Sequence, residues 1–131
     1  MSLKQKTIRQ VQNEAWDQVI SLQDQMHPNW RTEKPRTLFT TGLASEVGGV
    51  CDQVTHLDGG GSQLLDPNKW NEGKVLHDLV DGWVMTVLVA ERSGFDEADF
   101  WVEWENVVKP QLIERANARN GAIISKELRI V

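Results

Sequence analysis

The sequence predicts an all-α fold of four to five helices arranged as a bundle. Three observations predict it: apolar residues recur at steps of three and four, glycine and proline separate the periodic segments, and no segment before the tail alternates as a β-strand does. The chain has 131 residues, of which 40% are hydrophobic, a size and composition that suit one globular domain. We therefore predict a single helical domain over residues 1–131, with its core in residues 5–120.

The first helix is predicted over residues 8–26, where one apolar stripe runs along a polar background. His27 and Pro28 end it, because proline clashes with a preceding helical turn. Residues 28–36 contain two prolines and mixed charge, so we expect a loop there.

A second helix is expected from about Thr37 to the glycine-rich loop that begins at Asp58. Glycines at positions 42, 48 and 49 interrupt it, and each costs up to about 1 kcal/mol relative to alanine. We interpret them as marks of close approach by another helix or by a ligand. The apolar stripe of this helix consists of Leu43, Val47, Val50, Val54 and Leu57.

The third helix is expected over residues 74–92, where apolar side chains nearly encircle the axis, as in a buried central helix. Asp96 is a suitable N-cap for a fourth helix. Pro110 breaks that helix or begins its next piece, and residues 112–120 are again helical in pattern. The segment at residues 121–131 is interpreted either as a simple tail or as an arm that packs on a partner chain.

The charge balance excludes several classes of partner. The chain has 14 Lys and Arg against 19 Asp and Glu, a net charge of −5, which argues against binding to nucleic acid or to an anionic membrane.

No apolar run is long enough to span a bilayer, and no signal-peptide core follows the first residues. The one cysteine, Cys51, cannot form an internal disulfide, and we expect a small packed side chain. We expect a soluble, cytoplasmic protein.

Two acidic residues do not fit a simple bundle. Asp78 and Asp81 lie among apolar neighbours, and residues three apart share one face of a helix. Buried like charges repel and lose hydration, so they need a compensating cation. Glu46 lies about 60° from the centre of the apolar stripe of the preceding helix, which directs it along the seam between helices. Three carboxylates suit Mg²⁺ or Mn²⁺, and magnesium in turn favours a phosphorylated substrate.

A purely structural interpretation of these acids stays open. Lys74 is four residues before Asp78 and is a possible ion-pair partner for it. Arg115 or Arg119 are possible partners for Asp81. Such ion-pair networks perturb buried acids without serving catalysis.

Two segments carry a family resemblance. Residues 43–50, LASEVGGV, and residues 75–81, VLHDLVD, resemble the E-x-x-E and E-x-x-D motifs of the MazG-like all-α nucleotide pyrophosphohydrolases, a group that includes dCTP pyrophosphatases and dimeric dUTPases. Residues 93–96 and 117–120 are similar to the exit of the family's third helix and to its Asn/Arg-bearing stretch. The resemblance covers roughly residues 10–120.

The sequence departs from the family pattern at two positions. Gly49 stands where the family has the second glutamate of the first motif, and Asp78 stands where it has a longer glutamate. Asp52 is a poor substitute, because it lies about 120° around the helix from Glu46. Three carboxylates hold one Mg²⁺ when phosphate oxygens complete its shell.

The resemblance implies a Mg²⁺-dependent enzyme that hydrolyses a nucleoside triphosphate to the monophosphate and pyrophosphate, and so controls or cleans the nucleotide pool. It also implies a homodimer or homotetramer that completes the bundle. Glu46, Asp78 and Asp81 are the predicted metal ligands and catalytic residues. Of the three, Glu46 is expected to act as the general base. The predicted substrate-binding residues are Lys74 for phosphate, and His56, Trp30, Trp70, Asn117 and Arg119.

Alternatives remain for these residues and for the function. The loop tryptophans Trp30 and Trp70 stack on a nucleobase or pack against the protein itself. His56 is a base contact or an ordinary helix-end capping group. Lys74 is a phosphate contact or a solvated lysine at a helix start. The whole protein is an active enzyme, a catalytically impaired relative that binds nucleotide and metal, or a plain helical interaction module.

Overall fold

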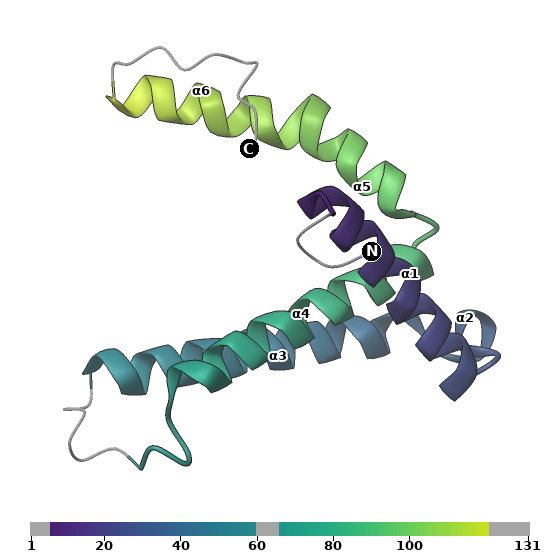
Figure 1. The fold of residues 1–131 in the computed structure, drawn as a ribbon, viewed down its shortest axis with the longest axis horizontal. Coiled ribbons are helices and arrows are strands. Elements are labelled where there is room, and N and C mark those ends of the chain that lie inside the picture. The colour runs from purple at the N-terminus through teal and green to yellow at the C-terminus, as the bar shows by residue number, and fades with distance from the viewer. Residues whose placement is uncertain (1–5, 60–65, 121–131) are drawn as a thin grey trace. The chain divides into compact units, whose positions relative to one another are not determined.

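The computed structural model describes residues 6–59 and 66–120, without the side chain of Asn120, and these residues confirm the predicted all-α class (Figure 1). No strand occurs in this described part of the chain. The predicted tail, residues 121–131, lies outside it. The chain divides into two compact units, residues 1–94 and residues 95–131, and each is described by itself. The single domain stays a prediction.

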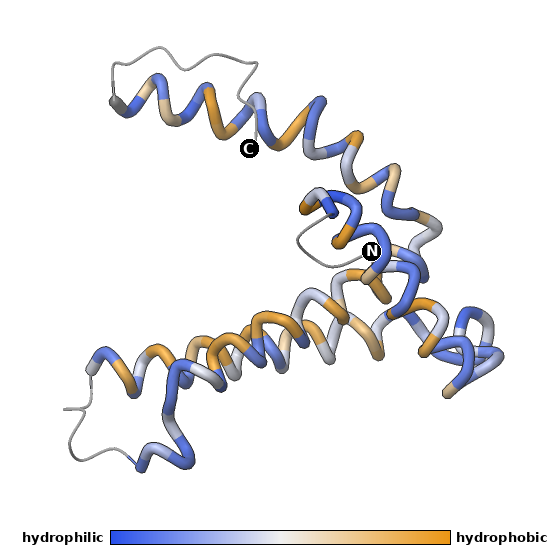
Figure 2. Tube along the Cα trace, viewed as in Figure 1, coloured by the Kyte–Doolittle hydropathy of each residue, from blue (hydrophilic) through white to orange (hydrophobic). Residues whose placement is uncertain are grey.

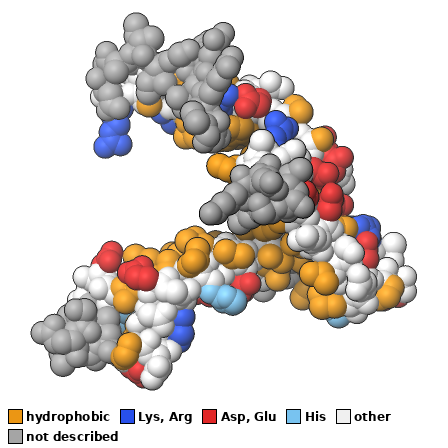
Figure 3. Space-filling model, viewed as in Figure 1, with side chains coloured by type: hydrophobic (Ala, Val, Ile, Leu, Met, Phe, Trp, Pro, Cys, Tyr) orange, Lys and Arg blue, Asp and Glu red, His pale blue; other side chains and the backbone are white. Residues whose placement is uncertain are grey.

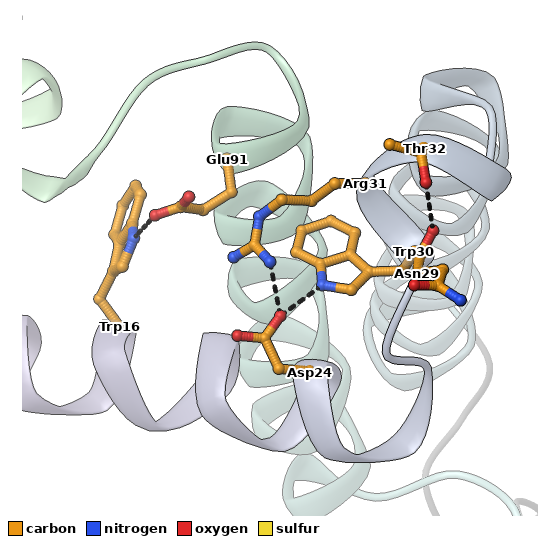
Figure 4. A network of polar contacts seen from close by, with 7 residues as sticks. All are labelled: Trp16, Asp24, Asn29, Trp30, Arg31, Thr32 and Glu91. Carbon is orange, nitrogen blue, oxygen red and sulfur yellow. Dashed lines mark hydrogen bonds and ion pairs between the residues drawn. The ribbon is translucent and has the colours of Figure 1, made fainter.

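The first helix, α1 (Ile8–Met26), has the predicted bounds. It begins with a capping box, in which the Thr7 side chain accepts from the Gln10 backbone N–H and the Gln10 side chain accepts from that of Thr7. Trp16 is buried, and its indole Nε1 donates to Glu91 at 3.1 Å (Figure 4). Because Glu91 belongs to a later helix, this bond fixes α1 on the rest of the first unit.

The expected loop at residues 28–36 is wrong in its middle, where a short helix, α2 (Trp30–Glu33), forms. Burial of Trp30, which is 1% exposed, is the physical reason. Its indole Nε1 donates to Asp24 Oδ1 at 2.7 Å, and Arg31 donates to the same oxygen at 2.6 Å (Figure 4). A buried tryptophan needs such a partner for its N–H, and together the contacts fix the turn.

Two long helices, α3 (Arg36–Gly59) and α4 (Glu72–Arg92), form an antiparallel hairpin (Figure 1). Phe39 packs in one cluster with Leu88, and further along α3 the glycines at 42 and 49 face Met85 and Asp78 on α4. The predicted stripe of Leu43, Val47, Val50 and Val54 is therefore not the line of contact with α4. It lies beside that line, and Val47 and Val54 are exposed.

The ends of α4 follow known capping rules. The side chain of Asn71 accepts from the backbone N–H of Lys74 at the N-cap, so the helix begins two residues before the predicted start. The C-terminal turn closes at Ser93, and Gly94 follows with φ of +88°. That left-handed conformation favours glycine, because it has no Cβ.

The core of the first unit lies where α1, α2, α3 and α4 meet. Trp30, Phe39 and Leu88 form its buried centre, and the rings of Trp30 and Phe39 meet edge to face at 5.4 Å. The expectation that α4 is buried on all sides is wrong, because α3 covers only one of its faces. Leu76, Leu79 and Val80 are 64%, 54% and 52% exposed. Hydrophobic residues recur along α3 and α4 (Figure 2), and hydrophobic side chains consequently gather on the surface of the hairpin (Figure 3).

The second unit is one uninterrupted helical segment with three parts, α5 (Glu97–Glu103), the π-helical turn η3 (Trp104–Val108) and α6 (Lys109–Asn120). Asp96 forms the predicted N-cap in a capping box with Asp99. Pro110 does not break the helical segment, and it lies in the first turn of α6, as the prediction that it begins the next helical piece requires. The backbone widens just before it, with the Lys109 N–H bonded to the Trp104 carbonyl, a π-type pattern that adapts the helix to a residue without an N–H.

None of the described helices combines the length and the apolar character that crossing a membrane requires.

Candidate metal centre

The α3–α4 hairpin brings Glu46, Asp78 and Asp81 together. One carboxylate oxygen from each lies within 4.8 Å of the others, and all three residues are half-buried. Asp78 and Asp81 share a face of α4, since they are three residues apart, and Glu46 comes from α3. The sequence therefore predicted correctly which acids meet.

Glycines allow the two helices to approach at this point. A methyl group on Gly82 would lie 3.7 Å from Cβ of Glu46, an ordinary van der Waals contact. A methyl group on Gly49 would lie only 3.1 Å from Asp78 Oδ2. Close approach of the helices therefore explains why glycine occupies position 49, and also position 42, which lies opposite Met85. It does not explain the glycine at position 48, where a methyl group would have no neighbour within 4 Å.

The cations that the sequence offered as partners for the acids either have other partners or belong to the second unit. Lys74 donates its ammonium to the backbone carbonyls of Asn68 and Lys69, the latter at 3.2 Å, and does not pair with Asp78. Within the described part of the first unit, neither Glu46 nor Asp78 pairs with a lysine or an arginine. Asp81 Oδ2 lies 3.0 Å from Nε2 of His77.

The donor set fits a hard divalent cation. Three carboxylate oxygens without thiolate or imidazole in the group suit Mg²⁺ or Mn²⁺ better than zinc or copper. Ligand oxygens around an octahedral Mg²⁺ lie about 3.0 Å apart when adjacent and about 4.2 Å apart when opposite, so oxygens within 4.8 Å must move closer by side-chain rotation to share one ion. Magnesium prefers six ligands, and water and phosphate oxygens would supply the remainder.

A second group of predicted residues meets further along the hairpin. The rings of His56 and Trp70 stack with centroids 3.6 Å apart and planes 9° from parallel. Lys69 lies over the Trp70 ring at 5.1 Å, and Gln53 donates to the Lys69 carbonyl at 3.1 Å. His56 Nδ1 also lies 3.3 Å from Asp52 Oδ1. Asp52 is not a member of the acidic cluster, which consists of Glu46, Asp78 and Asp81.

Trp30 does not take the role predicted for a loop tryptophan. Its ring lies inside the core and its N–H bonds Asp24, so the alternative of packing against the protein describes it. Asn117 and Arg119 lie on α6, in the second unit. Two residues correspond to about 200° of helix rotation, so the two side chains leave α6 on nearly opposite sides. Cys51 is exposed rather than packed.

Sequence reasoning missed two neighbours of these groups. His77 Nε2 lies 3.0 Å from Asp81 Oδ2, and the spacing of four residues on a predicted helix was a signal that could have found it. Lys69 had no such signal, because its contact with Trp70 depends on the turn that precedes α4.

Comparison of the chain with protein-family models, with curated proteins and with solved structures finds no match.

Proposed function

We propose that the protein is a Mg²⁺-dependent nucleoside triphosphate pyrophosphohydrolase, which converts a (d)NTP and water to the (d)NMP and pyrophosphate. The observation that supports the proposal most is the convergence of Glu46, Asp78 and Asp81, from two helices, to within 4.8 Å. The resemblance of both motifs to the MazG-like enzymes supports the same reaction. The activity would remove or balance nucleotides in the cellular pool.

Each acidic residue of the cluster would have a distinct role in the reaction. Asp78 and Asp81 would hold the ion from α4, and Glu46 would face it from α3 and accept a proton from the attacking water. The oxygen of that water bonds to the α-phosphorus, the bond from this phosphorus to the bridging oxygen breaks, and pyrophosphate leaves with the electron pair. Bound Mg²⁺ would neutralise the triphosphate and make the water a better nucleophile.

The stacked pair of His56 and Trp70 is the proposed position of the nucleobase. His56 is ten residues from Glu46, about 15 Å of rise along α3. Base stacking on an aromatic ring contributes about 1–3 kcal/mol. The Lys74 ammonium already donates to two backbone carbonyls, so we assign it the role of fixing the turn before α4 rather than of binding phosphate.

The active form would be a homodimer or homotetramer. Leu76, Leu79 and Val80 form one exposed apolar row on α4, and Val47 and Val54 are exposed on α3. A hairpin with such a face buries little apolar surface by itself, whereas two hairpins together make a four-helix bundle. We propose a second copy of the chain as the occupant of this face.

The test is pyrophosphate release from a panel of NTPs and dNTPs with Mg²⁺. Asp81→Asn should lower the rate at least about 100-fold, because it removes a charged ligand of the ion. Glu72→Gln is the matched control: it removes a carboxylate from the exposed first turn of the same helix and should retain activity. No release with any nucleotide would contradict the enzymatic proposal.

A specific observation also favours the second candidate, a relative that binds nucleotide and metal without turnover. Gly49 faces Asp78 at the position where the resembled family has another carboxylate, so the cluster is one ligand short of the family's four. In that case calorimetry would detect binding of nucleotide with Mg²⁺ while no pyrophosphate forms. The same measurement made without Mg²⁺ separates metal-dependent binding from simple stacking.

A further inference from the structure

His77 contacts the proposed metal site from outside. Its Nε2 lies 3.0 Å from Oδ2 of Asp81, one turn further along α4. The His77 side chain is 74% exposed and that of Asp81 is 42% exposed, so the imidazole lies on the solvent side of the carboxylate.

The contact leaves part of Asp81 free for an ion. A carboxylate has two oxygens, and an imidazole nitrogen placed against Oδ2 leaves Oδ1 and its lone pairs open. His77 itself is not in the group whose ligand atoms lie within 4.8 Å of one another, which consists of Glu46, Asp78 and Asp81. The contact that links His77 to the cluster is therefore the one with Asp81.

Asp81 differs in this respect from the other two acids. Within the described part of the first unit, it is the one member of the cluster with an ion-pair partner. An exposed carboxylate without a partner rotates among several rotamers, and binding an ion in one of them costs the entropy of the others. An outer contact that selects one orientation reduces that cost and raises the affinity for the ion.

We propose that His77 is a positioning residue, which holds the Asp81 carboxylate in the orientation that binds the divalent cation. This inference rests on the proposed function, because it needs the cluster to bind a cation. It predicts an effect on metal affinity in the absence of any nucleotide. It also predicts that a side chain with an amide N–H in place of the imidazole restores most of that affinity.

The experiment is a titration of the full-length protein with Mn²⁺ alone, followed by electron paramagnetic resonance. His77→Ala should weaken Mn²⁺ binding by about tenfold, the lower end of the usual range for outer partners of a ligand, since this one is exposed. His77→Gln should bind nearly as well as the wild type. Melting without metal should be unchanged in both variants, because they alter one exposed contact.

His56→Ala provides the matched control. His56 also pairs with an aspartate four residues away on a helix, at 3.3 Å from Asp52, but that pair lies outside the acidic cluster. The His56→Ala variant should have the same affinity for Mn²⁺ as the wild type. A loss equal to that of His77→Ala would overturn the inference, because any exposed imidazole would then have the same effect.

The remaining outcomes separate this inference from the proposed function. Wild-type binding that His77→Ala does not weaken would overturn the role of His77 and leave the cation site intact. A failure of His77→Gln to restore affinity, or a nitrogen coupling typical of imidazole bound directly to Mn²⁺, would also overturn the positioning role. No binding by the wild type would overturn the cation site and the role of His77 together.

Discussion

At the scale of single residues, the acidic cluster forms because its three carboxylates occupy positions that two packed helices bring together. The spacing of Asp78 and Asp81 fixes them on one face of any helix, and the position of Glu46 beside an apolar stripe directs it to a neighbouring helix. The contacts of Lys74 and the stack of His56 on Trp70 depend on how the turn before α4 folds back on α3. No periodicity encodes such a contact, so sequence reasoning could not predict it.

Gly49 and Gly48 offer a matched test of the open ligand position. Gly49→Glu would place a fourth carboxylate beside Asp78, whereas Gly48→Glu adds the same charge to open space on the same helix. We expect the first substitution to raise the affinity for Mg²⁺ by about tenfold, or about 1.4 kcal/mol, and to lower stability without the ion through repulsion.

Thermal melting with and without Mg²⁺ measures both effects, because an ion bound only by the folded state stabilises it. The Gly48→Glu variant should respond to Mg²⁺ as the wild type does. Equal responses of the two variants would show that position 49 does not face the ion.

Asp24 makes stability depend on pH. Its pKa is lowered from the ordinary value of 3.8, because Trp30 and then Arg31 donate hydrogen bonds to the ionised carboxylate. A lowered pKa in the folded state stabilises the protein above the unfolded-state value, and the stabilisation is lost as the pH falls below 3.8 through the folded value.

Asp24→Asn should therefore reduce the free energy of unfolding at neutral pH, and the difference from the wild type should shrink in acid. Urea denaturation at neutral pH and well below pH 3.8 measures it. Asp17→Asn, an exposed change on the same helix, is the control. A difference that does not change with pH would contradict the assignment to the charged form of Asp24.

At the scale of elements, four predicted helical segments are present, and the structure differs from the prediction at the connections between them. The bounds of α1 follow from its capping box and from the proline after it, both local signals. The short α2 depends on burial of Trp30 against Phe39, a contact with a later helix that no local pattern reveals. The π turn before Pro110 likewise results from how the backbone adapts to the missing N–H.

The glycines of α3 allow a test of its contact with α4. Gly48→Ala should raise the free energy of unfolding by about 0.5–1 kcal/mol, because alanine favours helix and position 48 is open. Gly42→Ala brings the same helix propensity, but its methyl group would lie 2.9 Å from Sδ of Met85. We expect a smaller gain or a net loss, and urea denaturation of both variants measures the difference. Equal gains would show that the hairpin has room at Gly42.

At the scale of the whole molecule, hydropathy alone misassigned α4. Apolar residues around its axis predicted burial, but a pattern cannot tell whether the same chain or another copy covers a face. In the structure one face packs on α3, while Leu76, Leu79 and Val80 stay exposed. The all-α class was predictable from periodicity, and the division into units at Gly94 was not, because the segment around it is a short helix connection of ordinary composition.

The exposed row on α4 predicts self-association. Leu76→Glu should convert the oligomer to a monomer, as measured by sedimentation equilibrium, because it buries a charge in the proposed interface. Position 76 lies about 200° around α4 from Asp78, so the change leaves the acidic cluster on the other side. Ser21→Glu, a charge added to an exposed position of α1, should leave the mass unchanged. A monomeric wild type would contradict the proposed assembly.

The contact between Met85 and Gly42 has a consequence for the behaviour of the protein under oxidising conditions. The Met85 sulfur lies so close to the Gly42 backbone that not even a methyl group fits between them. Peroxide converts a thioether to a sulfoxide, which adds a polar oxygen to that sulfur. At this close contact the added oxygen would push α3 and α4, the helices that carry Glu46 and Asp78, further apart. Chemical damage one turn away would thus loosen the acidic cluster without touching any carboxylate, and methionine sulfoxide reductase would reverse it.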